Sequence, residues 1–93
     1  HWQNVMIGHS AANQIPVIAS NRIGIETEQD ISLTFYGSSF ITDHMGNIIK
    51  KMDENSEGII SQEFDLEEIK KYRQSWGNFR DRRPDLYKKI CDF

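Results

Sequence analysis

Residues that could carry out catalysis are few in this 93-residue chain, and they form no complete catalytic set. The single cysteine, Cys91, is the third residue from the end of the sequence and has Lys88, Lys89 and Asp92 beside it. A nucleophilic cysteine needs a base, such as a histidine, held next to it, and nothing near Cys91 in the sequence orients it in that way. We therefore interpret Cys91 as a surface or packing residue.

The histidines do not predict a metal site. His1, His9 and His44 are far apart in the sequence, and together with Cys91 they show none of the short spacings typical of zinc ligands. A histidine such as His9, on the face of a predicted helix, is more often a core or interface residue. We expect neither a metal nor a cofactor.

Two groups of polar residues adjoin predicted strands. Ser38 and Ser39 follow Gly37 but lack the strand-to-helix turn that exposes a nucleophilic serine, so we interpret them as sheet residues. The candidate substrate-binding residues come at the end of a predicted buried strand, a position where α/β proteins often place ligands. They are Ser20, Asn21 and Arg22. A structural alternative stays open, in which Arg22 pairs with a carboxylate and Asn21 holds a loop.

The segment "SWGNFRDRRPDLYKK", residues 75–89, concentrates arginines and aromatic residues. Its candidate interface residues are Trp76, Phe79, Arg80, Arg82, Arg83 and Tyr87. The net charge of the chain is −3, whereas nucleic-acid binding normally shows as a strongly basic domain or face. Asp81 and Asp85 can each pair with an arginine, and arginine, tryptophan and tyrosine are typical interface anchors. The segment therefore favours a structural or interface role over nucleic-acid binding.

Length and composition allow one domain at most, which we expect to bury roughly 60–65% of the surface of the extended chain. A lone cysteine cannot form an internal disulfide, which suggests a reducing compartment and a cytoplasmic protein. No apolar run approaches the ~18 residues of a membrane span, so we expect no membrane partner.

A helix is predicted over residues 2–13. Five residues recur there at three- and four-residue steps, a spacing that places them on one helix face. These residues are Trp2, Val5, Met6, His9 and Ala12. Small neighbours such as Gly8 and Ala11 would allow close approach of another element, and Pro16 ends the helix.

The middle of the chain predicts strands. The apolar run 17–19 is typical of a strand buried on both faces, and residues 24–30 are predicted to form an acidic loop. A three-strand meander follows, with a bulge or close backbone approach at Gly37, a turn at Gly46-Asn47 and a last strand over 59–64.

The C-terminal part predicts a helix capped by Asp65, with Glu67 and Glu68 in its first turn, where the helix dipole favours carboxylates. A short last helix is predicted to begin at Pro84, since proline is favoured at the first helical position.

Three long patterns identify a resemblance: "HWQNVMIGHSAANQIPVIASNRIG", "TFYGSSFITDHMGNII" and "FDLEEIKKYRQSWGNFRDRRPDLY". In this order they resemble the C-terminal part of the nitrilase superfamily of carbon–nitrogen hydrolases, and within it the N-carbamoylputrescine amidases. The resemblance implies an α+β fold, a partial nitrilase-type α-β-β-α sandwich with an N-terminal helix, buried strands and meander, and a C-terminal helix and extended tail. Residues 1–93 would be the C-terminal part of one hydrolase domain, with the tail from about 74–93.

The resemblance also implies an activity for the whole enzyme. The family uses a Glu-Lys-Cys triad and a cysteine thioacyl intermediate, but all three residues precede the segment matched by His1, so this chain would lack them and be inactive alone. The implied reaction is hydrolysis of N-carbamoylputrescine to putrescine, carbon dioxide and ammonia. The alternatives are a β-ureidopropionase or ω-amidase type of amidase, or a non-catalytic interaction module.

The partners implied by the resemblance are a small-molecule carbamoyl or amide substrate and further copies of the chain. The N-terminal helix, through Trp2, Met6 and His9, and the tail would join subunits of a homo-oligomer. Ser20, Asn21 and Arg22 would lie near the active site, and the tail arginines would pair with carboxylates.

Overall fold

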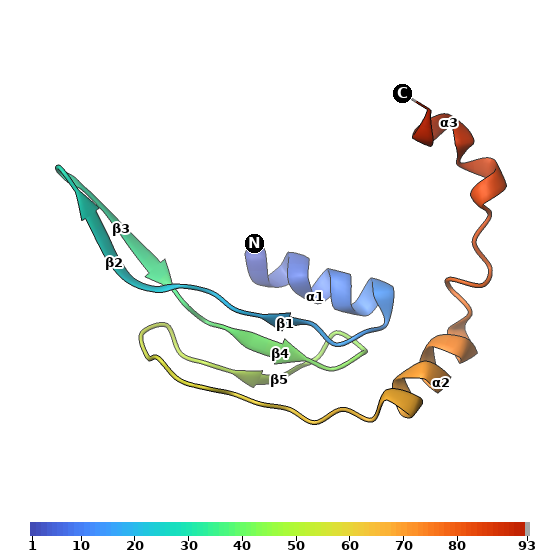
Figure 1. Cartoon of the computed structure of the whole chain (residues 1–93), viewed down its shortest axis with the longest axis horizontal. Coiled ribbons are helices and arrows are strands. Elements are labelled where there is room, and N and C mark those ends of the chain that lie inside the picture. The colour runs from blue at the N-terminus through green and yellow to red at the C-terminus, as the bar shows by residue number, and fades with distance from the viewer. Residues whose placement is uncertain (93) are drawn as a thin grey trace.

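The structure is a computed structural model that describes residues 1–92 of the chain. Helix α1 covers a small sheet, a long hairpin runs out from that sheet, and the C-terminal helices extend away on the other side (Figure 1). The elements are α1 (Trp2–Asn13), β1 (Ile18–Ala19), β2 (Ile23–Glu28), β3 (Ile31–Tyr36), β4 (Phe40–Thr42), β5 (Ile48–Lys51), α2 (Leu66–Trp76), the 3-10 helix η1 (Pro84–Leu86) and α3 (Lys88–Cys91).

The chain is far more open than a compact domain of its size. Its radius of gyration is 18.0 Å, against about 12 Å for a compact domain of this length. Its exposed surface is 7641 Å², whereas a compact protein of this mass exposes about 5,600 Å². Only about half of the extended-chain surface is therefore buried, so the prediction of 60–65% is wrong. The reason is that apolar faces of the strands lie uncovered.

Helix α1 rests on the sheet through a face partly different from the predicted one. The buried and half-buried positions along it are Trp2, Gln3, Met6, Ile7, Ser10, Asn13 and Gln14. Val5, His9 and Ala12 are exposed, so this part of the predicted face does not pack on the sheet. The interface role predicted for His9 stays a prediction. The helix ends at Asn13 as Pro16 indicated, and Gln14 caps it in the left-handed conformation, φ 55°.

Hydrogen bonds explain which face of α1 is buried. The Ser10 hydroxyl lies 2.9 Å from the carbonyl oxygen of Ile15 and 2.8 Å from that of Asp43. Thr42 donates its hydroxyl to Ser10 over 2.8 Å and accepts the N–H of Val17 over 2.9 Å. Ser10 and Thr42 are fully buried. Burial of Ser10 allows all of these hydrogen bonds to form. A pattern of hydrophobic residues predicts burial only of apolar side chains, so it could not predict that Ser10 is buried.

The three-stranded sheet has the order β1-β4-β5 and is antiparallel. Ala19 lies opposite Phe40, and both are buried on the side of α1. Ile18, which points to the other face because strand side chains alternate, is 70% exposed. The run 17–19 is therefore covered on one face, and the prediction of a strand buried on both faces is wrong for this chain.

The second sheet is the hairpin β2–β3, in which Ile23 pairs with Tyr36 and Glu28 with Ile31. The prediction of a loop over 24–30 is wrong, because β2 continues to Glu28 and only Gln29 and Asp30 form the turn. Both faces of this hairpin are largely exposed, so polar residues are tolerated along it. The alternation of apolar and polar residues that would predict a strand is therefore weak.

The predicted three-strand meander is also wrong in part. β3 and β4 belong to different sheets, and Ser38 and Ser39 lie in the connection between them instead of in a sheet. Within residues 1–92, the segment 59–64 is extended but pairs with no strand. Ile60 and Phe64 are half-buried, whereas Ile59 is 96% exposed and Gln62 is exposed as well, so the segment alternates only in its apolar residues. A strand assignment needs a hydrogen-bonded neighbour, which the described residues do not provide.

The predicted C-terminal helices are confirmed. Asp65 caps α2 by accepting the N–H groups of Glu67 and Glu68 over 3.0 and 3.2 Å. The ring of Tyr72 on α2 meets that of His44 edge-on, with centroids 4.8 Å apart, and joins the helix to the loop after β4. η1 begins at Pro84. No helix in the described part of the chain is long and apolar enough to cross a membrane.

Candidate functional site

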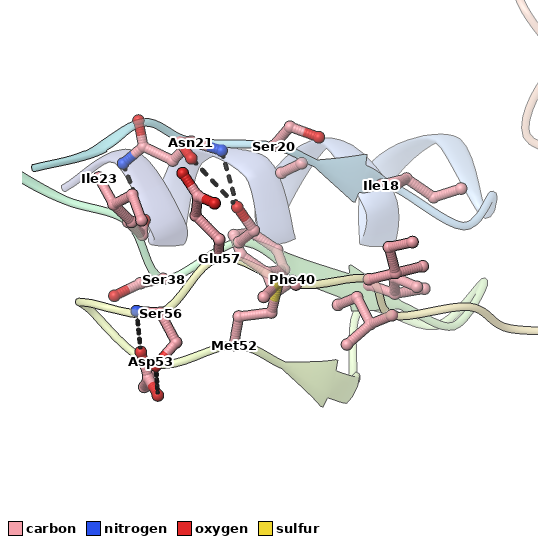
Figure 2. A pocket seen from close by; sticks show the side chains of 17 residues that line it. Ile18, Ser20, Asn21, Ile23, Ser38, Phe40, Met52, Asp53, Ser56 and Glu57 are labelled. Carbon is pink, nitrogen blue, oxygen red and sulfur yellow. Dashed lines mark hydrogen bonds between the residues drawn. The ribbon is translucent and has the colours of Figure 1, made fainter.

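The candidate site is an open pocket of about 420 Å³ at the end of β1. Three segments line it: the end of β1 with the residues that follow, the β3–β4 connection, and the segment 52–60 after β5. Figure 2 shows side chains from all three segments around the hollow. Two of the predicted substrate-binding residues, Ser20 and Asn21, contribute to the lining.

Asn21 holds the pocket wall together. Its side-chain amide donates to the carbonyl oxygen of Gly37 over 2.8 Å, and its backbone N–H donates to the hydroxyl of Ser39 over 2.8 Å. Its side-chain oxygen accepts the N–H of Arg22 over 2.9 Å. The bonds that join Asn21 to Gly37 and to Ser39 are among those drawn in Figure 2. The structural alternative for Asn21, that it holds a loop, is confirmed.

Gly37 is the point at which the three segments meet. Its φ is +54°, a left-handed conformation that glycine adopts readily. A Cβ at this position would lie 2.5 Å from Cγ2 of Ile23 and 3.2 Å from the carbonyl oxygen of Asp53. The N–H of Gly37 donates to the carbonyl oxygen of Arg22, and that of Ser38 to Asp53. The close backbone approach predicted at Gly37 is confirmed.

Ser20 and Arg22 differ in their relation to the pocket. Ser20 is exposed and lines it. Arg22 is not part of the lining, because its guanidinium lies 3.0 Å from the Glu26 carboxylate and 4.2 Å from the ring centroid of Phe35. Both partners of the ion pair are more than half exposed, so the pair adds little to stability. The structural alternative for Arg22 is confirmed, and a contact of Ser20, Asn21 or Arg22 with substrate stays a prediction.

Two carboxylates lie on the far wall of the pocket. Hydrogen bonds from the N–H groups of Asn55 and Ser56 hold the pKa of Asp53 below its usual range, so this group stabilises the turn. Glu57 also lines the pocket, and its carboxylate forms no hydrogen bond or ion pair among residues 1–92. Glu57 was not among the predicted site residues, because it stands in an acidic turn with nothing to distinguish it from its neighbours.

The described residues hold no assembled catalytic set. Cys91 is exposed in α3, and no group of three or more metal-binding side chains occurs in this part of the chain. Four serines line the pocket, and the hydroxyls of Ser38, Ser39 and Ser56 are already hydrogen-bonded. What the pocket offers a ligand is therefore the Ser20 hydroxyl and the free carboxylate of Glu57 beside apolar walls. That combination suits binding of a polar ligand and contains no nucleophile with its base.

The arginines of the tail pair with neighbouring carboxylates. Arg80 contacts Asp81 through two hydrogen bonds of 2.8 and 3.0 Å, and Arg83 contacts Asp85 in the same way over 3.1 and 2.7 Å. The hydrogen bonds from Arg80 lower the pKa of Asp81. The predicted pairing with Asp81 and Asp85 is confirmed, although all four side chains are exposed and the pairs are individually weak.

Phe79 organises the rest of the tail. The guanidinium of Arg73 lies 4.8 Å from its ring centroid and that of Arg82 lies 5.5 Å from it. Arg82 also donates to the carbonyl oxygen of Phe79 over 2.8 Å. Trp76 and Tyr87 are exposed. The predicted role of these residues in a subunit interface stays a prediction.

Both the sequence and the fold of this chain are similar to those of known proteins. The family model for carbon-nitrogen hydrolases matches residues 1–74, and the chain belongs to this family. Its backbone is also similar to a solved carbon-nitrogen hydrolase from Helicobacter pylori G27, with a TM-score of 0.82 and 36% sequence identity over 98% of this chain and 32% of the other. The predicted nitrilase-type fold is thereby confirmed.

The individual relatives include amidases and a citrullinase. N-carbamoylputrescine amidase from Arabidopsis thaliana is 56% identical over 92 residues, covering 95% of this chain and 31% of the relative. Citrullinase from Francisella tularensis is 53% identical over 90 residues, covering 97% of this chain and 32% of the relative. The chain thus spans about a third of the length of the relatives it matches.

Proposed function

We propose that the complete protein is an amidohydrolase that acts on N-carbamoylputrescine and, with one water, yields putrescine, carbon dioxide and ammonia. The observation that carries this proposal is the 56% identity to an N-carbamoylputrescine amidase over almost the whole chain. Membership of the carbon-nitrogen hydrolase family supports cleavage of a carbon–nitrogen bond.

The proposed chemistry proceeds through a cysteine thioacyl intermediate, which divides one difficult hydrolysis into two easier steps. We propose that the nucleophile is not Cys91, because that residue is exposed on a four-residue helix and far along the chain from the pocket residues. The role of the present segment is to build one wall of the site, with Asn21 and Gly37 fixing the wall and Ser20 and Glu57 facing the hollow.

Citrulline is the second candidate substrate, supported by the 53% identity to a citrullinase. Both compounds carry a carbamoyl group on a short alkyl chain. They differ at the other end, where N-carbamoylputrescine has an ammonium group and citrulline has both an ammonium group and a carboxylate. The free carboxylate of Glu57 in the pocket wall favours a purely cationic end over one that also carries negative charge.

We also propose that copies of the protein associate through α1 and the tail, in the cytoplasm. The exposure of His9 on the outer face of α1 and of Trp76 on α2 supports this proposal. Trp2 and Met6 are already half-buried within the chain, so they would contribute less to such an interface than His9 and its exposed neighbours.

Ammonia release by the complete protein tests the proposed activity. We expect kcat/KM for N-carbamoylputrescine to exceed the values for citrulline, β-ureidopropionate and a simple ω-amide by at least about tenfold. A preference for one of the other three substrates would replace the proposed substrate, and no turnover of any of them would favour a non-catalytic interaction module. The variant C91S should keep kcat/KM within about twofold of the unmodified protein. If C91S were inactive, the proposal that Cys91 is not the nucleophile would be wrong.

A further inference from the structure

Ser38, in the connection between β3 and β4, has a backbone conformation that its residue type disfavours. Its φ is +61°, and it follows Gly37, whose φ is +54°. Glycine adopts this left-handed region readily, whereas a residue with a Cβ does so only at a cost in free energy. Such residues cluster at functional sites, where the surrounding contacts impose the conformation. The contacts of Ser38 therefore indicate what the conformation achieves.

The left-handed connection directs two successive N–H groups to two different segments. The N–H of Gly37 donates to the carbonyl oxygen of Arg22 over 2.9 Å, and the N–H of Ser38 donates to that of Asp53 over 3.1 Å. The hydroxyl of Ser38 donates to the carbonyl oxygen of Tyr36 over 2.9 Å, a local bond that holds its backbone in this conformation. The connection is thereby fixed to the residues after β1 on one side and to the segment after β5 on the other.

The bond to Asp53 reaches the turn that precedes Glu57. The carboxylate of Asp53 accepts the N–H groups two and three positions ahead, over 2.8 and 2.6 Å, so residues 53–56 form one hydrogen-bonded turn. Glu57 comes directly after this turn and lines the pocket. Figure 2 shows the side chain of Ser38 beside the turn. Ser38 therefore joins the wall that contains Glu57 to the rest of the pocket.

The same two segments are joined a second time. The N–H of Met52 donates to the carbonyl oxygen of Ser39 over 2.8 Å. A change at Ser38 should therefore leave the segments attached and loosen only the turn that follows Met52. All of these donors and acceptors belong to this chain, so the geometry does not depend on which other segments cover the sheet in the complete protein.

We propose that Ser38 is a positioning residue for substrate binding. Its left-handed conformation holds the wall with Glu57 at a fixed distance from Ser20, so the pocket has its binding geometry before substrate enters. Such pre-organisation improves affinity, because binding then orders fewer groups. Ser38 acts through Glu57 and not on the carbon–nitrogen bond, so it affects KM more than kcat. The inference rests on the proposed function and adds the residue that fixes the spacing of its site.

The test is Ser38→Gly in the complete protein, because glycine adopts the same φ without strain but also adopts many other conformations. With the substrate that the unmodified protein hydrolyses best, we expect KM to rise about fivefold and kcat to stay within about twofold. The midpoint of thermal unfolding should change by less than about 2 °C. A rise in KM without loss of stability is a result that a merely structural role of Ser38 would not give.

Two further variants complete the test. Ser38→Asn should keep KM within about twofold of the unmodified protein, because asparagine tolerates the left-handed region and bonds to nearby backbone. Gln29→Gly is the matched control, since Gln29 also has a positive φ, 55°, but lies in the β2–β3 turn and not in the pocket lining. It should leave KM and kcat unchanged.

Three results would overturn the proposal: an unchanged KM in Ser38→Gly, an equal rise of KM in Ser38→Asn, or an equal rise in Gln29→Gly. A fall in kcat at constant KM would also contradict it. If the unmodified protein hydrolyses none of the four substrates, the proposed function fails and this inference fails with it. If it hydrolyses one of them and Ser38→Gly has no effect, only this inference is wrong.

Discussion

The indole ring of Trp2 meets the ring of Phe40 edge-on, with centroids 5.4 Å apart and an interplanar angle of 74°. Phe40 is fully buried in β4, and Trp2 stands in the first turn of α1. This pair therefore fixes the start of the helix to the centre of the sheet. The residue before Phe40 is Ser39, which bonds to Asn21 in the pocket wall. Packing under α1 and the geometry of the candidate site are thus joined through two consecutive residues, Ser39 and Phe40.

Removing the Phe40 ring should destabilise the complete protein strongly. We expect Phe40→Ala to lower the free energy of unfolding by about 3–5 kcal/mol, because it leaves a cavity where side chains cannot close in fully. Equilibrium urea unfolding measures this change. The control is Tyr36→Phe, which keeps the other ring that contacts Trp2 and should change stability by less than about 0.5 kcal/mol. A loss below about 1 kcal/mol in Phe40→Ala would show that the helix is held elsewhere.

The buried hydroxyl of Thr42 should contribute more to the free energy of unfolding than its methyl group does. Thr42→Val keeps the shape but leaves the Val17 N–H without its acceptor and Ser10 without a donor. We expect a loss of about 1–3 kcal/mol in the same unfolding experiment. Thr42→Ser retains the hydroxyl and should lose only about 1 kcal/mol, from the missing methyl. If both variants lost the same amount, the hydrogen bonds would be shown to contribute nothing net.

Gly37 should tolerate a side chain less well than Gly24, although both have positive φ. A Cβ at Gly24 meets open space, so Gly24→Ala reports backbone strain alone. A Cβ at Gly37 would collide with Ile23, so Gly37→Ala should exceed the cost of Gly24→Ala by at least about 1 kcal/mol. Thermal unfolding of the two variants compares them. Equal costs would contradict the tight contact described at the pocket wall.

Asp43 should make stability depend on pH in the acid range. Partial burial alone would raise its pKa, but hydrogen bonds from Asn47 and from the N–H of Met45 outweigh this and leave the pKa below its usual value of 3.8. The ionised group therefore stabilises the fold above about pH 4, and this contribution is lost as the pH falls through the lowered pKa.

The variant Asp43→Asn isolates this effect. The difference in unfolding free energy between the unmodified protein and Asp43→Asn should be constant at neutral pH and shrink below about pH 4. Urea unfolding at a series of pH values measures it. A difference that does not change between neutral and strongly acid pH would show that the loop does not depend on the charge of Asp43.

Much of the local structure could be predicted from the sequence, because the responsible contacts span only a few residues. Asp65 bonds to N–H groups two and three positions ahead, Pro84 begins η1, and Pro16 follows the end of α1. The close backbone approach at Gly37 was also predictable, since glycine inside an apolar pattern is typical of one. The family resemblance depends on the same linear order of residues and is confirmed by comparison.

Other features were decided by partners distant in the sequence. Thr42 and Ser10 bond across 32 positions and draw a polar face of α1 inward, against the hydrophobic pattern. Residues 23–28 form a strand because residues 31–36 pair with them, whereas residues 59–64 have a strand pattern but no neighbouring strand within residues 1–92. Glu57 enters the pocket wall only because segment 52–60 turns back beside β1. Local propensities are properties of the sequence itself, but buried hydrogen bonds, strand pairing and the composition of a pocket depend on which distant segments come together, and only the tertiary structure decides that.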